Sequence, residues 1–511
     1  MKKKYAFLLL ISLLGIVFLN AQQLQLDTTY GVDGINNANV DLTVTYKYPD
    51  NKIIAVTKPT ASYPSLMPTI RVHKYTEDGA LDTTFGTNGI ANYIATSFKD
   101  RFDMYGVTVQ PDGKILTYGQ TYQVGSTSYY YQFFICRFNE NGTVDTNFGT
   151  NGIIKHSLNT FNQKRERFLD AVVDENNKIT AVGYTEIDGY LDSNAVAMRF
   201  LSDGTVDTTF GTDGVMQFSP NTYDFFSKIY LLGPSTYMMV GGTNVTTTDR
   251  DAYILKITEN GTFDNNFGTN GSITINFSAG LDSISKIFFL ADNTMLAAGT
   301  SVGSVAFAKI NANGTLDTSF NGDGMNTTYV PVPNHYPLTG GNIELLPDGK
   351  FILASTCKRN DDSTNNYDYG IARLNANTSL DTSFMTNGVY VDVVTGTNEF
   401  ARGIYVQQDG KVLVLVNGRI YRYINFSPLT LTDVIANYTI NLYPNPARDY
   451  FIINSDEQIN EIEIYSIDGK LIQTITNLAE NKIDVTHLIS SLYFIKISNS
   501  KFSKTIKLIK Q

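Results

Sequence analysis

Seven aspartates along this chain share one local context, in which an aromatic residue follows three positions later and a glycine four positions after that. In the pattern D-x-x-F-G-x-[ND]-G, one carboxylate lies near asparagine and main-chain oxygens, which is chemistry that suits calcium. Calcium prefers about six to eight oxygen ligands and usually several carboxylates, whereas most copies offer one aspartate and one asparagine. A calcium loop is therefore one hypothesis and a structural turn is the other, and no other cofactor is predicted.

The structural hypothesis explains each invariant position of this motif. An aspartate accepts hydrogen bonds from main-chain N–H groups two or three residues on, the aromatic ring suits a wedge between neighbouring units, and the last glycine suits a positive φ. The aspartates are Asp27, Asp82, Asp145, Asp207, Asp264, Asp317 and Asp381, the aromatic residues are Tyr30, Phe85, Phe148, Phe210, Phe267, Phe320 and Phe384, and the glycines are Gly34, Gly89, Gly152, Gly214, Gly271, Gly324 and Gly388. We interpret the motif as the connection between consecutive units.

Few other residues offer catalytic chemistry. The histidines are His73, His156, His335 and His487. They lie in different units or domains without paired spacing, which disfavours a zinc site or a Ser-His-Asp relay. Cys136 and Cys357 are far apart in sequence, and we interpret both as buried apolar residues rather than a disulfide. The loop "RNDDSTNNYDYG" at 359–370 is rich in oxygen donors, and a solvated polar loop is favoured there over a metal site.

The spacing of the motif defines the repeating unit. The copies lie 53 to 64 residues apart, about 59 on average, which indicates an array of supersecondary units. Each unit also contains an apolar alternating run interrupted by a tight turn, as in "VTVQPDGKILTYG" at 107–119, and Asp-Gly between alternating hydrophobic residues predicts a β-hairpin. A short segment precedes this hairpin and a further run follows it, so four strands per unit are predicted.

Seven four-stranded units predict an all-β fold. We expect residues 22–426 to form a seven-bladed β-propeller, because radial closure leaves only short strand edges exposed. Both ends of this region fall near a unit boundary, so the ring is expected to close without a strand swap. A β-solenoid of the same repeats is the alternative, because repeat number alone does not establish closure.

The N-terminus has the order of a secretory signal peptide. Lys2, Lys3 and Lys4 precede an apolar run that ends at Asn20 and Ala21, so residues 1–21 are predicted to be removed by cleavage between Ala21 and Gln22. The run is too short to cross a bilayer, and no later stretch is long and apolar enough to do so. The net charge of −10 becomes more negative once the leader lysines are lost, which disfavours nucleic-acid binding.

The composition changes after residue 426. Residues 427–436 are predicted to be a linker, and residues 437–511 contain short strands with tight turns, which predicts a small Ig-like β-sandwich. "NLYPNPARDYFII" at 441–453 places two prolines before a strand, and "IEIYSIDGKLIQTI" at 462–475 is typical of a hairpin.

Two known families resemble these regions. The core "LD-x-x-F-G-x-x-G" followed by a "PDGKI" hairpin resembles the delta-60 repeat family over residues 24–426, which implies an extracellular repeat domain without a defined ligand. The C-terminal segment resembles the type A C-terminal sorting domain of cargo for the type IX secretion system. The matching residues are Tyr443, Pro444, Asn445, Pro446, Asp468, Gly469, Lys470, Ile483, Asp484, Val485, Leu488, Tyr493, Lys507, Leu508, Ile509 and Lys510. This resemblance implies Sec export, then transfer by the type IX machinery to the outer surface or the medium.

Two functions of different classes follow. A secreted or cell-surface scaffold for non-catalytic binding or adhesion is favoured, with an unknown glycan or protein ligand, and no catalytic residue is predicted. The alternative is an extracellular propeller hydrolase acting on polysaccharide, for which two or more buried carboxylates would face one central pocket. Asp27-Thr28-Thr29, Asp82-Thr83-Thr84 and Asp207-Thr208-Thr209 also resemble an O-glycosylation signal of bacteria with this secretion system.

Overall fold

The computed structural model divides the chain into two compact units, Met1–Ser427 and Pro428–Gln511. The residues that it describes are 24–37, 42–57, 67–124, 129–159, 164–186, 192–233, 236–246, 248–360, 366–393, 398–424, 440–443, 445, 447–455, 459–466, 471–476, 481–489, 491–498 and 503–510. The predicted signal peptide with its cleavage site at Ala21 and Gln22, and the predicted linker 427–436, lie outside these residues.

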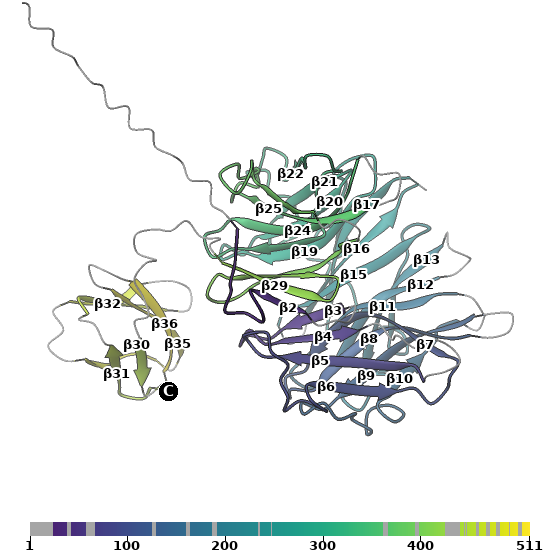
Figure 1. Cartoon of the computed structure of the whole chain (residues 1–511), viewed down its shortest axis with the longest axis horizontal. Helices are drawn as coiled ribbons and strands as arrows, with labels where there is room; N and C mark the ends of the chain where they lie inside the picture. Colours follow the sequence, from purple (N-terminus) through teal and green to yellow (C-terminus); the bar gives the residue numbers. More distant parts are fainter. Residues whose placement is uncertain are drawn as a thin grey trace, which may run out of the picture. The chain divides into compact units, whose positions relative to one another are not determined.

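In its described residues, the first unit consists of seven antiparallel sheets, which are the blades of a β-propeller (Figure 1). Blade 1 contains β3 (Leu42–Lys47), β4 (Ile53–Thr57), β5 (Thr69–Tyr75) and β6 (Ile90–Ile94); blade 2 contains β7 (Asp100–Val109), β8 (Ile115–Val124), β9 (Tyr129–Phe138) and β10 (Ile153–His156). Blade 3 contains β11 (Glu166–Val173), β12 (Ile179–Glu186), β13 (Ser193–Phe200) and β14 (Val215–Phe218); blade 4 contains β15 (Asp224–Leu231), β16 (Thr236–Asn244), β17 (Arg250–Thr258) and β18 (Ser272–Ile275).

The remaining blades repeat this order, and each of the first six blades is a meander of four consecutive strands. Blade 5 contains β19 (Ser283–Phe289), β20 (Met295–Ser301), β21 (Ser304–Ile310) and β22 (Met325–Thr328); blade 6 contains β23 (Asn342–Leu345), β24 (Phe351–Lys358), β25 (Tyr367–Leu374) and β26 (Val389–Asp392). Blade 7 contains β27 (Ala401–Val406), β28 (Val412–Val416) and β29 (Arg419–Ile424), together with β1 (Gln25–Leu26) and β2 (Ile35–Asn37).

The composition of blade 7 shows how the ring closes. Both β1 and β2 pair antiparallel with β29, so the N-terminal segment supplies the outermost strands of the last blade. The innermost strand β27 of blade 7 also contacts β3 of blade 1. The prediction of closure without a strand swap is therefore wrong, and the β-solenoid alternative is excluded because the last unit contacts the first. The first and last strands of the repeat region share the sheet of blade 7, and this removes an exposed sheet edge where the ring closes.

The predicted hairpins form the turns between the first and second strands of the blades. Residues at these turns adopt a positive φ, for example Asn51 at 65°, Gly113 at 83° and Asn177 at 60°. Asparagine and glycine tolerate this conformation at low cost, which explains why "PDNK", "PDGK" and "ENNK" substitute for one another at this place.

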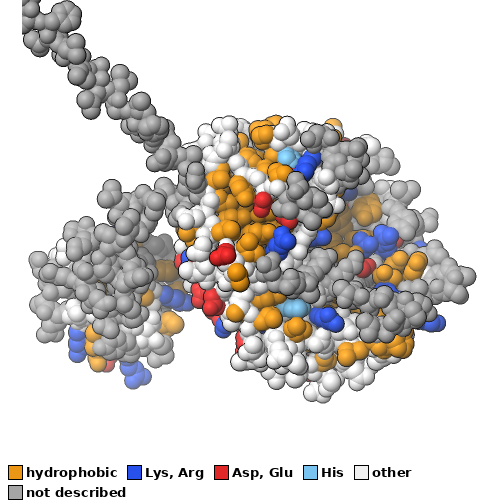
Figure 2. All heavy atoms as spheres, in the orientation of Figure 1, with side chains coloured by type: hydrophobic (Ala, Val, Ile, Leu, Met, Phe, Trp, Pro, Cys, Tyr) orange, Lys and Arg blue, Asp and Glu red, His pale blue; other side chains and the backbone are white. Residues whose placement is uncertain are grey.

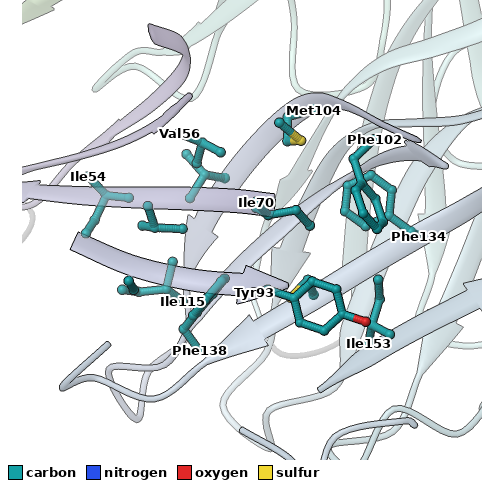
Figure 3. Packing of buried hydrophobic residues seen from close by; sticks show 14 of the residues in the cluster. Ile54, Val56, Ile70, Tyr93, Phe102, Met104, Ile115, Phe134, Phe138 and Ile153 are labelled. Atoms are coloured by element: carbon teal, nitrogen blue, oxygen red, sulfur yellow. The ribbon is translucent and has the colours of Figure 1, made fainter. Parts of the chain in front are cut away.

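The apolar core lies between neighbouring blades. Each pair of adjacent blades shares one cluster of buried side chains, and the cluster between blades 7 and 1 includes Tyr30, Leu42 and Leu413. Figure 3 shows the cluster between blades 1 and 2, where Ile54, Val56 and Ile70 pack near Phe102 and Phe134. Because each cluster is built by two sheets, no blade can bury its apolar face alone.

The innermost strands are bent by β-bulges. In the described residues, six of these seven strands contain a register shift against the second strand, β23 being the exception. In blades 2 to 5 the shift brings a main-chain carbonyl of the first strand onto a glycine of the second strand, as Arg167 does to Gly183. A Cβ atom there would overlap the carbonyl oxygen, so the glycine permits the bulge.

The C-terminal unit is a β-sandwich. One sheet contains β30 (Ile440–Tyr443), β31 (Tyr450–Ser455) and β34 (Lys482–Asp484); the other contains β33 (Leu471–Thr476), β32 (Glu461–Ser466), β35 (Ser491–Ser498) and β36 (Ser503–Lys510). One cluster joins both sheets, with Phe451 and Ile453 from the first and Ile495 and Leu508 from the second. In the described part of the chain, no helix has the length and apolarity needed to span a bilayer.

Replacing Tyr30 by alanine tests the closure of the ring. This ring is 1 % exposed and packs between blades 7 and 1, as Phe148 packs between blades 2 and 3. We expect Tyr30→Ala and Phe148→Ala each to lower the free energy of unfolding by about 3–5 kcal/mol, because each leaves a cavity at a blade interface. The measurement is urea unfolding of the two variants beside the exposed control Thr28→Ala. A cost for Tyr30→Ala no larger than the control would contradict the closed ring.

Candidate functional site

The recurring motif lies inside each blade rather than between blades. In blade 2, for example, Asp145 and Gly152 lie between β9 and β10, which pair with each other. The interpretation of the motif as the chain connection between units is therefore wrong, because the short strand after the motif returns to the same sheet. The first copy, at Asp27, is separated from its blade in sequence and completes blade 7.

The two carboxylate oxygens of the motif aspartate have different partners. One oxygen accepts hydrogen bonds from the residue two positions on; Asp207 Oδ1, for example, accepts from Thr209 N at 3.1 Å and from Thr209 Oγ1 at 2.6 Å. The other oxygen contacts a cation of the third strand in every blade. These ion pairs are Arg422–Asp27, Lys74–Asp82, Arg137–Asp145, Arg199–Asp207, Lys256–Asp264, Lys309–Asp317 and Arg373–Asp381.

In six blades, all but the fifth, the same cation lies over the motif's aromatic ring. The guanidinium of Arg137 lies 4.1 Å from the centroid of Phe148, and that of Arg422 lies 4.5 Å from Tyr30. Arg137 Nη1 also donates to the carbonyl oxygen of Ser202 in the next blade at 2.5 Å. The aspartate thus orders the turn, and the third-strand cation stacks on the motif's aromatic ring. Where that cation is an arginine, as at Arg137, it also contacts the neighbouring blade.

These contacts bear on the calcium hypothesis. The lysine of the "PDGK" hairpin adds a second cation in several blades; Lys350 lies 2.7 Å and Arg373 lies 2.8 Å from Asp381 Oδ2. Ammonium and guanidinium groups occupy the positions where further oxygen ligands would be required, so the geometry assigns this carboxylate to an ion-pair network. The described residues contain no group of three or more His, Cys, Asp and Glu side chains that could hold a metal ion.

A cavity of about 420 Å³ lies on the propeller axis. All seven innermost strands line it, from Val44 and Thr45 on β3 to Tyr405 on β27. Its volume is in the range of about 300–1,000 Å³ that holds small ligands or one sugar residue of a chain. The bulges direct side chains of the innermost strands into this space, and this cavity is the candidate functional site.

Charged side chains line one part of the cavity. Asp170, Lys228 and Lys286 occupy equivalent positions directly after the bulges of blades 3, 4 and 5, at intervals of 58 residues. Lys228 Nζ lies 3.7 Å from Asp170 Oδ1, and Lys286 pairs with Glu344 of blade 6. Gly106 and Gly403 hold the same position in blades 2 and 7, where Tyr105, Arg402 and Tyr405 also line the cavity.

Both cavity carboxylates have a lysine partner, and Asp170 has further hydrogen bonds. Asp170 accepts hydrogen bonds from Tyr118 Oη and from the main-chain N of Ile229, each at 3.1 Å, in addition to its contact with Lys228. Glu344 is bound by the ammonium group of Lys286. Two carboxylates therefore line the central cavity, which was the feature expected of a hydrolase, but each is held by a lysine.

A second set of carboxylates lies buried at the start of the innermost strands. This set comprises Asp100, Glu166, Asp224, Asp282 and Glu399. Burial raises the pKa of Glu166 to about 7, although hydrogen bonds to its carboxylate from residues 157–159 and Thr185 act in the opposite direction. Glu166 Oε1 accepts from the main-chain N of Leu158 at 2.7 Å and that of Asn159 at 3.0 Å. Its side chain is fully buried, so we interpret it as an anchor for the crossover from β10 to β11.

One histidine has a carboxylate partner that its sequence spacing did not reveal. His335 Nε2 lies 2.9 Å from Asp368 Oδ2, and Arg359 binds the same carboxylate through Nε at 2.6 Å. Cys357 is nearby, but its thiol donates to the main-chain oxygen of Asp368, and burial raises its pKa to about 12. A thiol in that state is a poor nucleophile, so we interpret the cluster as structural.

The sequence did not identify the cavity residues, although a signal for them exists. The segments between the motif and the innermost strand differ in length, so alignment on the motif aspartate displaces Asp170, Lys228 and Lys286 from one another. Alignment on the hairpin turn instead places all three eight residues before the end of the turn. In the Asp-Thr-Thr sequences, Thr28, Thr83 and Thr208 are exposed, while the following threonines bond to the aspartates.

In the C-terminal unit, Asn445 joins the motif segment to the last strand. Its Nδ2 donates to the main-chain oxygen of Lys507 at 2.7 Å, and its Oδ1 accepts from Ile509 N at 2.9 Å. Asp484 Oδ1 accepts from Thr486, and Tyr493 Oη donates to the main-chain oxygen of Ile489 at 3.1 Å. Pro444, Pro446, Asp468, Gly469 and Lys470 lie outside the described residues, as does part of the loop 359–370.

Comparison with known families identifies both regions. Residues 441–511 match the model of a secretion system C-terminal sorting domain. The segments 110–148, 175–210, 290–320 and 346–384 match the domain of unknown function (DUF5122) beta-propeller. Each of these four segments contains a hairpin turn and ends at the aromatic residue of the motif, namely Phe148, Phe210, Phe320 or Phe384. No curated protein sequence matches this chain.

Solved structures of other propellers are similar to this chain at low identity. A catalytically inactive virginiamycin B lyase from Staphylococcus aureus is 13% identical, with a TM-score of 0.41 over 76% of this chain and 96% of that one. A streptogramin B lyase is 11% identical, with a TM-score of 0.38 over 76% and 94%. The extracellular domains of Drosophila Semaphorin 1a are 8% identical, with a TM-score of 0.36 over 75% and 85%. Likenesses of this degree support no inference about activity.

The motif ion pairs predict a loss of stability in acid. Burial of the Asp207 carboxyl raises its pKa, but hydrogen bonds from Thr209 and Lys178 and the charge of Arg199 outweigh this and lower the pKa to about 2. Asp381 has a pKa of about 2 for similar reasons. Because the unfolded value is about 3.9, these carboxylates stabilise the fold fully above about pH 5 and lose that contribution as the pH falls toward about 2.

Asp207→Asn tests this assignment. We expect a large destabilisation at pH 7, about 3–5 kcal/mol, because the buried Arg199 loses its partner, and a smaller difference from the unsubstituted chain at each step down to pH 2. The measurement is urea unfolding at several pH values, with Asp409→Asn on an exposed hairpin turn as control. A destabilisation by Asp207→Asn that does not depend on pH would contradict the ion-pair role.

Proposed function

Since this chain is a DUF5122-type β-propeller protein with a type IX secretion C-terminal sorting domain, we propose that it acts outside the cell as a non-catalytic binding protein. The sorting domain directs the protein through type IX secretion to the cell surface or the medium, and it is the part that engages the secretion machinery. The proposed ligand site is the axial cavity, whose lining differs from blade to blade while the motif does not.

The observation that carries this proposal is the bonding of the cavity carboxylates. A glycosidase needs one carboxyl group as proton donor and a second as base or nucleophile, and both must reach the substrate. Asp170 is engaged by Lys228, Tyr118 and Ile229, and Glu344 is engaged by Lys286. Fixed, paired charges of this kind suit recognition of a polar ligand better than proton transfer.

A hydrolase remains the second candidate because two carboxylates line one cavity. A binding protein would retain the ligand unchanged, whereas a hydrolase would cleave it. The test is a panel of polysaccharides and peptides offered to the purified full-length secreted chain, with retention and release of reducing ends or amines measured in parallel.

We expect retention of a ligand without turnover. Lys228→Gln and Lys286→Gln are each expected to weaken retention of the ligand about tenfold, because each removes one charged hydrogen bond from the lysine to the bound ligand. Lys52→Gln on the hairpin face is the control and is expected to leave retention unchanged. Turnover that disappears in Asp170→Asn or Glu344→Gln, but persists in Asp112→Asn, would replace the binding function by the hydrolase.

A further inference from the structure

Arg167 and Arg250 differ from the arginines of the motif. The motif arginines 137, 199, 373 and 422 each bind an aspartate. Arg167 Nε instead donates to Gln120 Oε1 at 3.1 Å, and Arg250 Nε donates to Asn244 Oδ1 at 2.9 Å. Among the described residues neither guanidinium has a direct ion-pair partner, and the carboxylate of Asp103 reaches Arg167 only through Gln120.

Aromatic rings connect the two arginines. The Arg167 guanidinium lies 5.2 Å from the centroid of Tyr105 and 5.6 Å from that of Tyr184. Tyr184 and Tyr223 have centroids 6.1 Å apart, as have Tyr223 and Phe225, and Arg250 lies 5.2 Å from Phe225. Tyr184 is only 6 % exposed and serves as a buried link, whereas the other members are half-buried at the surface. We call this set, which crosses blades 2, 3 and 4, the aromatic–arginine strip.

The strip begins at the axial cavity and lies on the face opposite the hairpin turns. Tyr105 lines the cavity. Arg167 and Arg250 stand at the starts of β11 and β17, and Tyr184 stands near the end of β12, so all three lie at the end of the blades away from the "PDGK" turns and the motif. Figure 2 shows basic side chains gathered beside hydrophobic ones near the place where Figure 1 shows β12 and β13.

Three tyrosines extend the aromatic surface on blade 2. The rings of Tyr122, Tyr129 and Tyr131 have centroids 5.2–6.0 Å apart, and Tyr129 is 47 % exposed. Tyr122 lies on β8, which pairs with β7, the strand that carries Tyr105. Exposed rings that are held by one another provide flat apolar platforms at low entropic cost.

We propose that the aromatic–arginine strip binds an anionic polysaccharide, with a chain of uronic acid residues as the ligand. Tyrosine rings pack against the apolar faces of sugar rings, and this role falls to tyrosine because the chain has no tryptophan. A guanidinium presents paired N–H donors that match a carboxylate, and two arginines along one strip match a polymer that carries a charge on each residue.

This inference rests on the proposed binding function and specifies its ligand. The test measures binding of the purified full-length secreted chain to polygalacturonate by affinity electrophoresis and calorimetry, with neutral dextran and xylan for comparison. We expect binding to polygalacturonate that weakens as salt increases, and no retardation by the neutral polymers.

The variants separate the strip from other surfaces. Arg167→Gln and Arg250→Gln keep hydrogen-bonding groups but remove the charge, and each is expected to weaken binding about tenfold or more. Tyr129→Ala, at an exposed ring, is expected to weaken binding without altering thermal unfolding, and Lys52→Gln on the opposite face is the matched control. Unchanged thermal unfolding of each variant shows that a loss of affinity belongs to the surface.

Each result decides between the two proposals. Absence of binding to polygalacturonate, equal binding to dextran, or binding that Arg167→Gln and Arg250→Gln leave intact would overturn the polyuronate assignment while leaving the binding function in place. Binding of nucleic acid at equal strength would overturn the glycan assignment as well. Release of unsaturated or reducing ends from polygalacturonate would overturn the non-catalytic function but not the strip.

Discussion

The ion pair between the motif aspartate and the third-strand cation is the interaction on which the rest of this structure depends. Three interactions meet at this pair. The aspartate orders its own turn, as Asp207 does, and the cation lies over the aromatic ring, as Arg199 does over Phe210. An arginine such as Arg137 also donates to the next blade. A buried charge without its partner would lower the free energy of unfolding, so the ion pair fixes the place where the fourth strand returns to the sheet. The seven ion pairs, together with the turns and rings that they hold, form one repeated set of contacts, which we call the frame of the propeller. The frame does not involve the variable loops.

This frame is concentrated on one face of the propeller. The hairpin turns and the motifs lie together there, and their lysines and aspartates neutralise one another, as Lys178 and Lys350 do for Asp207 and Asp381. The opposite face carries the starts of the innermost strands and the crossovers between blades. On that face Arg167 and Arg250 have no direct ion-pair partner among the described residues, and exposed tyrosines such as Tyr129 occur there. This division supports the proposal that the face with the hairpin turns and motifs stabilises the ring, whereas the opposite face binds the ligand.

Much of the fold could be predicted from the sequence, because hairpin turns and alternating strands are local features. The Asp-Gly turns and the period of about 59 residues led to four-stranded blades. The position of the motif could not be derived in this way. A short strand such as β10 can pair with the strand before the motif or begin the next unit, and only the tertiary pairing with β9 decides between them. The same ambiguity hid the role of Asp27, whose partner Arg422 lies at the other end of the repeat region.

The candidate site was less predictable than the fold. Asp170, Lys228 and Lys286 face one cavity because bulges at equivalent places turn the innermost strands, and in these three blades a glycine of the neighbouring strand, Gly183, Gly241 or Gly299, permits the bulge. Arg167 and Arg250 follow no period, and what distinguishes them is that neither has a direct ion-pair partner among the described residues. The 58-residue spacing of Asp170, Lys228 and Lys286 can be read from the sequence, but the bulges that turn these side chains toward one cavity cannot.

The central claim is that the first copy of the motif completes the last blade on equal terms with the other six. In each blade the third-strand cation donates its main-chain N–H to the carbonyl of the motif's last glycine, from Arg137 to Gly152 at 2.9 Å and from Arg422 to Gly34 at 3.0 Å. Native-state hydrogen exchange at the Arg422 amide measures that closure directly. We expect its protection to be within about tenfold of that at Arg137, Arg199 and Arg373, because all four then open only with the ring. Exchange at Arg422 that is orders of magnitude faster than at the other three would show a frayed seam and contradict the account.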